Sequence, residues 1–267
     1  KQENCTPITP YIQIAGNEKA MFEDLRKNVG WLISKTLHET LKNTDDSIIK
    51  CYQKIIQNFD VTLSFNWDIL YEHTYKNLKS ESIPINQLGF NQNMLCKPAL
   101  LKLHGSLSWG KCSKCGLYIS DSKIEHLVHQ GMRCPKCNEN SLEPTSILPA
   151  LNKFQIITKD KDDLKALPPF RNIWHCAMHS LTDAVEIYFF GYSLSDKDAH
   201  TQIFFKSAMK KNINGDIKVY VINKCNDKDK EKLEERYNNT LGNKKVRIEF
   251  ITDKSFKEFL EEYKTDE

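Results

Sequence analysis

Short, continuous apolar runs alternate along this chain with segments in which apolar residues recur every three or four positions. The short runs are rich in Val, Ile, Leu and Phe, as buried parallel strands are. Five runs are predicted as strands: 61–65, 99–103, 185–190, 217–222 and 246–251. The periodic segments are predicted as helices: 18–41, 47–57, a segment ending at 78, 173–184, 196–211, 228–237 and 255–263. This alternation predicts an α/β fold with a doubly wound, Rossmann-like parallel sheet.

Small or polar residues follow four of the predicted strands. These are Asn66 with Asp68, His104 to Ser106, Gly191 to Ser193, and Asn223. Because ligands of open α/β sheets bind beyond the carboxyl ends of the strands, we expect these groups to lie together. Structural alternatives stay open: Asn66 or Asp68, and Ser193 or Ser195, could cap the helices that follow.

His104 is the candidate for chemistry. It stands directly before Gly105 at the end of a strand, which suits a ligand site better than core packing. A neutral imidazole can accept a proton near pH 7. A single histidine is also often structural, and that alternative stays open here.

Two CxxC pairs, Cys112 with Cys115 and Cys134 with Cys137, lie eighteen residues apart. Such spacing is typical of structural zinc, and four thiolates leave the metal no open position. His126 and His129 lie between the pairs and could compete as ligands, but four cysteines suffice. We therefore predict a zinc-ribbon insert over 110–140, with 1–109 and 141–267 forming the core.

Composition narrows the class of protein. Of the 267 residues, 40% are hydrophobic and 27% charged, and the net charge of +3 favours no polyanionic partner, so nucleic acid is disfavoured. No apolar run approaches the length of a membrane span. The other cysteines are scattered and odd in number, which favours a reducing cytoplasm: Cys5, Cys51, Cys96, Cys176 and Cys225.

In chain order, these motifs resemble the sirtuin-like (silent information regulator) family, and its bacterial branch more than its protein deacylases. Ser64-Phe-Asn-Trp-Asp68 is similar to the family's Thr-Gln-Asn-Ile-Asp stretch, and Leu103-His-Gly-Ser106 to its His-Gly element. The ribbon follows where the family places it. Gly191-Tyr-Ser-Leu-x-Asp196 and Val221-Ile-Asn223 are similar to later motifs.

The resemblance implies NAD as ligand and substrate. His104 would act as general base on a ribose hydroxyl or order the attacking water, with Asn66 orienting the water or the nicotinamide ribose. Asp68 would hold the carboxamide. The remaining NAD-binding positions implied are Ser64, Gly191, Ser193 and Asn223.

One departure from the family pattern concerns its opening strand and Gly-Ala-Gly loop, whose amides cradle the pyrophosphate. The stretch Ile14-Ala-Gly-Asn17 has a single glycine. The expectation is that this loop lies upstream of Lys1, or that the chain binds NAD poorly.

Three functions follow from these observations. The first is an NAD glycohydrolase that releases nicotinamide and ADP-ribose, with a role in defence against phage. The second is an NAD-dependent deacylase, with an acylated protein as partner. The third is a zinc-ribbon binding module without activity. The sequence leaves a homo-oligomer open.

Overall fold

The computed structural model describes residues 39, 43–90, 95–120, 133–140, 142–144, 170–196 and 198–263. Apart from residue 39, the helix predicted over 18–41 lies outside this part, as do Ile14–Asn17 and the histidines His126 and His129. Residues 44–267 form one compact unit that contains the elements described below.

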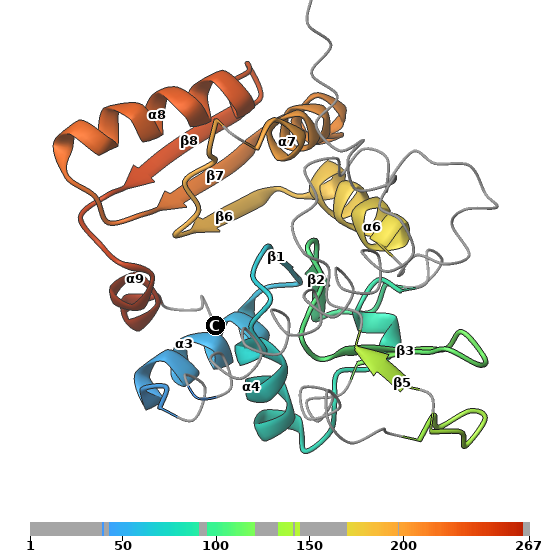
Figure 1. Cartoon of the computed structure of the whole chain (residues 1–267). Helices are drawn as coiled ribbons and strands as arrows, with labels where there is room; N and C mark the ends of the chain where they lie inside the picture. Colours follow the sequence, from blue (N-terminus) through green and yellow to red (C-terminus); the bar gives the residue numbers. More distant parts are fainter. Residues whose placement is uncertain are drawn as a thin grey trace, which may run out of the picture. The chain divides into compact units, whose positions relative to one another are not determined.

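All five predicted strands are confirmed, each within one residue of its expected ends. β1 (Val61–Ser64) pairs in parallel with β2 (Ala99–Lys102). β6 (Glu186–Phe190), β7 (Ile217–Ile222) and β8 (Val246–Ile251) form a second parallel sheet in that order (Figure 1). The predicted α/β class with parallel strands is therefore confirmed.

The helices follow the predicted periodicity, and four of them, α3, α7, α8 and α9, begin at a side-chain cap. Their bounds are α3 (Asp46–Asn58), α4 (Leu70–Lys79), η1 (Ile85–Gln87, a 3-10 turn), α6 (Phe170–Asp183), α7 (Ala199–Lys211), α8 (Asp227–Leu241) and α9 (Phe256–Glu262). Within the described part of the chain, none of them has the length and apolar character needed to cross a bilayer.

The start predicted for α7 at residue 196 is wrong by three residues. The side chain of Asp198 accepts a hydrogen bond from the backbone N–H of Thr201, so the helix begins at Ala199. Asp198, and neither Ser193 nor Ser195, caps this helix.

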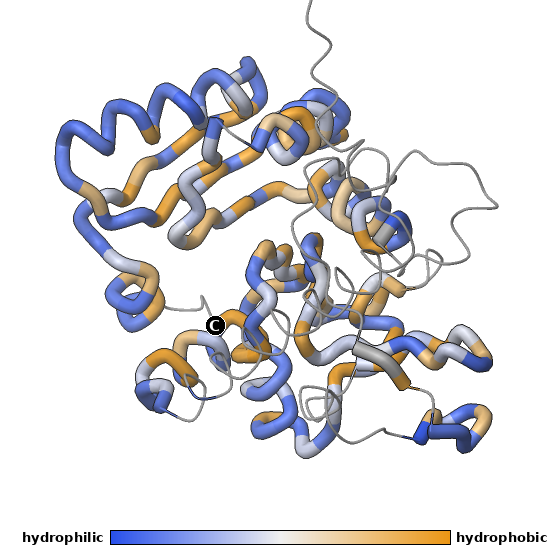
Figure 2. The backbone as a smooth tube through the Cα atoms, viewed as in Figure 1, coloured by the Kyte–Doolittle hydropathy of each residue, from blue (hydrophilic) through white to orange (hydrophobic). Residues whose placement is uncertain are grey.

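The central strand of the β6–β7–β8 sheet is buried. The β7 side chains of Ile217, Val219 and Val221 are fully buried, and α8 covers the sheet through apolar residues such as Leu233 and Tyr237. Figure 2 shows the same division, with hydrophobic strands beneath a largely hydrophilic outer face of α8. This burial holds the strand ends in fixed positions.

The two parallel sheets are joined by aromatic contacts. Among the described residues, β1 pairs only with β2 and β6 only with β7, so the hydrogen-bonded sheet is in two parts. Before β1, Phe59 makes an edge contact with Tyr188 of β6, with ring centroids 5.1 Å apart. After β1, Phe65 stacks on Tyr192 at 4.8 Å. Rings at both ends of β1 therefore fix it beside β6.

A small antiparallel sheet forms the ribbon lobe. β3 (Trp109–Cys112) lies between β4 (Tyr118–Ser120) and β5 (Leu142–Pro144). The lobe begins and ends within a few residues of the insert predicted over 110–140. The division of the chain into core and insert stays a prediction.

Candidate functional site

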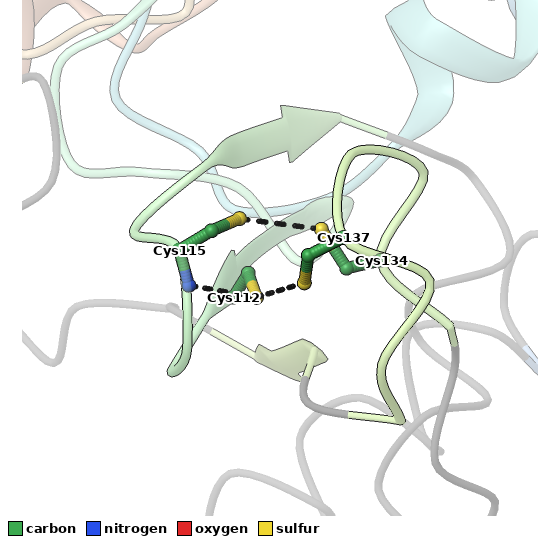
Figure 3. Close-up of side chains that lie close together, drawn as sticks. All are labelled: Cys112, Cys115, Cys134 and Cys137. Carbon is green, nitrogen blue, oxygen red and sulfur yellow. Dashed lines mark hydrogen bonds between the residues drawn. The ribbon is translucent and has the colours of Figure 1, made fainter.

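Four cysteine sulfurs converge in the ribbon lobe (Figure 3). The sulfurs of Cys112, Cys115, Cys134 and Cys137 all lie within 4.8 Å of one another. The Cys112–Cys137 pair is 3.6 Å apart and the Cys115–Cys134 pair 3.5 Å. Four sulfurs at about 2.3 Å from one zinc ion stand about 3.8 Å apart in a tetrahedron. The arrangement is therefore compatible with a four-coordinate zinc ion.

The two knuckles repeat the same backbone geometry. Gly116 N–H donates to the Cys112 carbonyl at 2.9 Å, and Asn138 N–H to the Cys134 carbonyl at 2.8 Å. Gly116 and Asn138 both adopt positive φ, +71° and +57°, which glycine and asparagine tolerate best. Backbone N–H groups also point at sulfur, with Lys136 N 3.4 Å from Cys134 Sγ.

The remaining described cysteines lie outside the ribbon: Cys51, Cys96, Cys176 and Cys225. Desolvation on burial raises the pKa of Cys51, Cys176 and Cys225. A raised pKa leaves less thiolate, the reactive form, at neutral pH. Burial therefore disfavours the thiolate form at these three positions.

The first group of predicted site residues lies at the end of β1. Ser64 is the last residue of the strand, and its hydroxyl accepts the Asn66 backbone N–H at 3.2 Å. Asn66 itself is exposed. Asp68 Oδ1 accepts the Leu70 N–H at 3.0 Å. The N-cap of α4 is Ile69, so neither Asn66 nor Asp68 caps this helix with its side chain, and Ser64 orders the backbone that presents Asn66.

Two tryptophans fix the turn that carries His104. The indole N–H of Trp67 donates to the His104 carbonyl at 2.9 Å, and that of Trp174 to the Leu103 carbonyl at 3.1 Å. Gly105 adopts φ +89°, where a side chain is disfavoured, and its N–H donates to the Lys102 carbonyl. The His104 backbone is therefore held on both sides, and the residue as a whole is half-buried.

Phe65 brings three strand ends together. Its ring meets the His104 imidazole edge-on, with centroids 5.1 Å apart, and stacks on Tyr192 at 4.8 Å. Tyr192 belongs to the turn after β6. Burial, together with the charge of Asp198, raises the pKa of Tyr192 to about 12, so its ring stays neutral. The β1, β2 and β6 ends thus share one aromatic cluster.

The remaining predicted residues follow β6 and β7. Gly191 adopts φ +61° and donates its N–H to the Ile222 carbonyl at 2.9 Å, which places it next to Asn223. Asn223 N–H bonds in turn to the carbonyl of Ile251. Ser193 is exposed. The four predicted groups therefore lie at successive strand ends that contact one another, as chain direction alone suggested.

Sequence reasoning missed a buried polar group beneath the site. Lys102 and Glu72 are 1% and 5% exposed, and Ser106 and Ser108 are fully enclosed beside them. The signal was the lysine inside the apolar run Ala99-Leu-Leu-Lys-Leu103. A lysine in such a run requires a buried partner, because an unpaired charge is costly there.

Comparisons with known proteins identify the fold of this chain. No family model and no curated protein matches the sequence. Among solved structures, a mutant Sir2 homologue in complex with ADP-ribose matches over 90% of this chain and 74% of its own, at 13% identity and a TM-score of 0.50. The fold is therefore that of the sirtuins.

Two further sirtuin structures match more loosely. One comes from work on the mechanism and regulation of Sir2 enzymes, with 15% identity, 79% of this chain covered and a TM-score of 0.42. The other is a Sir2 homologue with NAD, with 14% identity, 81% of this chain covered and a TM-score of 0.41. This chain spans 64% and 62% of their lengths.

Proposed function

We propose that this chain is an NAD-consuming enzyme of sirtuin type and that its reaction is hydrolysis of NAD to nicotinamide and ADP-ribose. The observation that carries the proposal is the contact of three strand ends through Phe65, which groups His104 with the Gly191–Ser193 turn. The likeness to a Sir2 homologue that binds ADP-ribose supports the same ligand class.

The proposed chemistry breaks the bond between ribose C1′ and the nicotinamide nitrogen. The bonding electrons neutralise the pyridinium, and C1′ passes through a state like an oxocarbenium ion. A water oxygen then bonds to C1′ and loses a proton. Because nicotinamide is already a good leaving group, the main task of the protein is to position the water molecule for attack on C1′.

In this proposal His104 accepts the proton or orders the water, and Asn66 orients it. The carboxylate of Asp68, which accepts the Leu70 N–H, would hold the nicotinamide carboxamide. Ser64 supports Asn66 through its hydroxyl. The larger NAD fragment, pyrophosphate and adenosine ribose, would lie along Gly191, Ser193 and Asn223. The cysteine cluster would hold zinc as a structural ion and take no part in the reaction.

The test is to incubate the full-length protein with NAD and to quantify nicotinamide and ADP-ribose chromatographically. We expect equimolar release and a loss of about a hundredfold or more in His104→Ala, because general-base catalysis contributes on the order of 10²–10⁴. His200→Ala, a half-buried histidine of α7, serves as the control. Absence of release, or unchanged release in His104→Ala, would contradict the proposal.

The same assay separates hydrolysis from acyl transfer. With an acetylated peptide present, a deacylase would remove acetyl groups strictly in step with nicotinamide release, whereas a glycohydrolase releases nicotinamide at the same rate without peptide. We expect the second result. The role in phage defence is proposed with the hydrolase, because depletion of NAD arrests a host cell.

A further inference from the structure

A buried ion pair lies directly behind the His104 turn. Lys102 is in β2, two residues before His104, and its Nζ stands 3.4 Å from Oε1 of Glu72 in α4. The same ammonium donates to the backbone carbonyl of Asp68. One side chain therefore ties the strand that ends at His104 to the loop that carries Asp68.

The Glu72 carboxylate collects further donors from the same turn. Its Oε1 accepts the Ser106 hydroxyl at 2.5 Å and the Ser108 hydroxyl at 3.2 Å. Glu72 also lies in the first turn of α4, where the helix dipole favours a negative charge. Charge-assisted bonds of this kind are shorter and more directional than neutral ones.

The hydroxyl network continues into the ribbon lobe. Ser108 Oγ lies 3.0 Å from Ser106 Oγ and 3.0 Å from Ser120 Oγ. Ser120 is in β4, opposite Trp109 of β3, the strand that ends at the zinc-type ligand Cys112. The route from Glu72 to the ribbon therefore consists of three contiguous hydroxyls.

Stability alone does not account for this arrangement. A buried ion pair is frequently no more stabilising than apolar side chains of equal volume. What it supplies, and apolar packing does not, is a fixed direction for each bond to the segments around it. Those segments are the loop that carries Asp68, the turn that contains His104 and Ser106, and, through Ser108, the ribbon lobe.

We infer that Glu72 and Lys102 are positioning residues that set the geometry of the His104 turn relative to Asp68, and that the serine hydroxyls register this turn against the ribbon lobe. The kinetic test of this inference rests on the proposed function. The structural test does not, because it observes the His104 side chain directly by NMR.

The central variant is Glu72→Gln, which keeps the shape and one acceptor oxygen but removes the charge. We expect kcat for nicotinamide release to fall about 10- to 100-fold with KM little changed, since misplacement of a catalytic group acts on the chemical step. We also expect the His104 ring signals in a ¹H–¹³C NMR spectrum to shift. The matched control is Glu186→Gln, which removes an exposed glutamate 3.1 Å from Lys218.

Two further variants keep the test decisive if Glu72→Gln does not fold. Ser106→Ala removes the 2.5 Å bond without unpairing a charge, and Glu72→Gln with Lys102→Met removes both charges together. A merely structural role predicts a lower Tm with unchanged His104 signals and unchanged kcat below Tm, and that result would overturn the inference. If the wild type releases no nicotinamide, the proposed reaction fails while the NMR arm still decides the positioning role.

Discussion

The ribbon lobe and the parallel core are stabilised by opposite means. In the core, thirty buried residues, most of them from β2, β6, β7 and the helices, form one continuous cluster, and partly buried residues of β1 and β8 pack against it. In the ribbon, the described buried cluster consists of Cys112, Cys134 and Leu142. Within the described part of the ribbon, so few buried side chains offset little of the conformational entropy lost on folding. The core therefore depends on many small contributions and the ribbon on one group of ligands.

Because of this difference, the two regions are expected to respond differently to mutation. A single deletion in the core removes one contribution among many, whereas one lost sulfur ligand opens the whole metal site. The boundary between the regions is the hydroxyl chain from Ser106 to Ser120, beside the candidate site. Disturbance of the ribbon is therefore expected to reach His104 before it reaches β7.

Removal of the metal ligands is expected to have the largest effect. Structural zinc binding contributes about 10–16 kcal/mol of apparent folding free energy in small zinc domains, so Cys134→Ser should abolish order in the ribbon. Amide NMR signals from β3 and β4 should collapse, while those of β7 and β8 persist. Metal analysis of the wild type should give one zinc per chain.

Ser113→Ala, an exposed position within the first knuckle, is the control for Cys134→Ser. A ribbon that keeps its amide dispersion after complete chelation of zinc would contradict this account. So would simultaneous loss of the β7 signals, because the two regions would then share one source of stability.

The complementary change is Leu101→Ala in β2, where the side chain is fully buried. Large-to-small substitutions of this kind cost about 2–5 kcal/mol, and chemical denaturation should show a loss in that range. Bound zinc should remain at one per chain. Ile213→Ala, at a position 77% exposed, should change the free energy of unfolding by less than about 0.5 kcal/mol. Zinc loss in Leu101→Ala would break the distinction between the regions.

The sequence predicted most of what local pattern determines. Apolar runs located the strands to within a residue, and the two CxxC pairs predicted both knuckles, because each depends on neighbours in sequence. The separation of the parallel strands into two hydrogen-bonded parts was not predictable from runs such as Val61–Phe65. Strand pairing depends on contacts distant in sequence, here the rings of Phe65 and Tyr192.

The candidate site divides in the same way. Chain direction alone places His104, Asn66 and Asn223 at strand ends. The bonds that hold the turn around His104 come from partners 30 or more residues away, as between Glu72 and Ser106 or Trp174 and Leu103. No short motif encodes those pairings. The lysine within the apolar run of β2 is the local sequence signal that points to a buried polar partner.

The smallest effect concerns the docking of α9 on the core and depends on pH. Hydrogen bonds from Ser255, first from its backbone N–H, and the nearby Lys224 ammonium lower the pKa of Glu258 to about 2 from its usual 4.5. A depressed pKa in the folded state stabilises the protein above the unfolded value of 4.5 and loses that contribution as pH falls toward 2. Glu258→Gln should therefore be less stable than wild type at pH 7, and the gap should close between pH 4.5 and 2.

The measurement is denaturant unfolding followed through β8 amide signals, because acid also protonates zinc ligands and would release the ribbon. Glu235→Gln, which removes an exposed glutamate of α8, reports the effect of a surface charge alone. A gap between Glu258→Gln and wild type that stays constant down to pH 2 would show that the capping interaction acts through shape and not through charge. In that case α9 would be held by apolar packing such as the Phe190–Phe256 contact, whose ring centroids lie 5.3 Å apart, and the charge of Glu258 would contribute nothing measurable to stability.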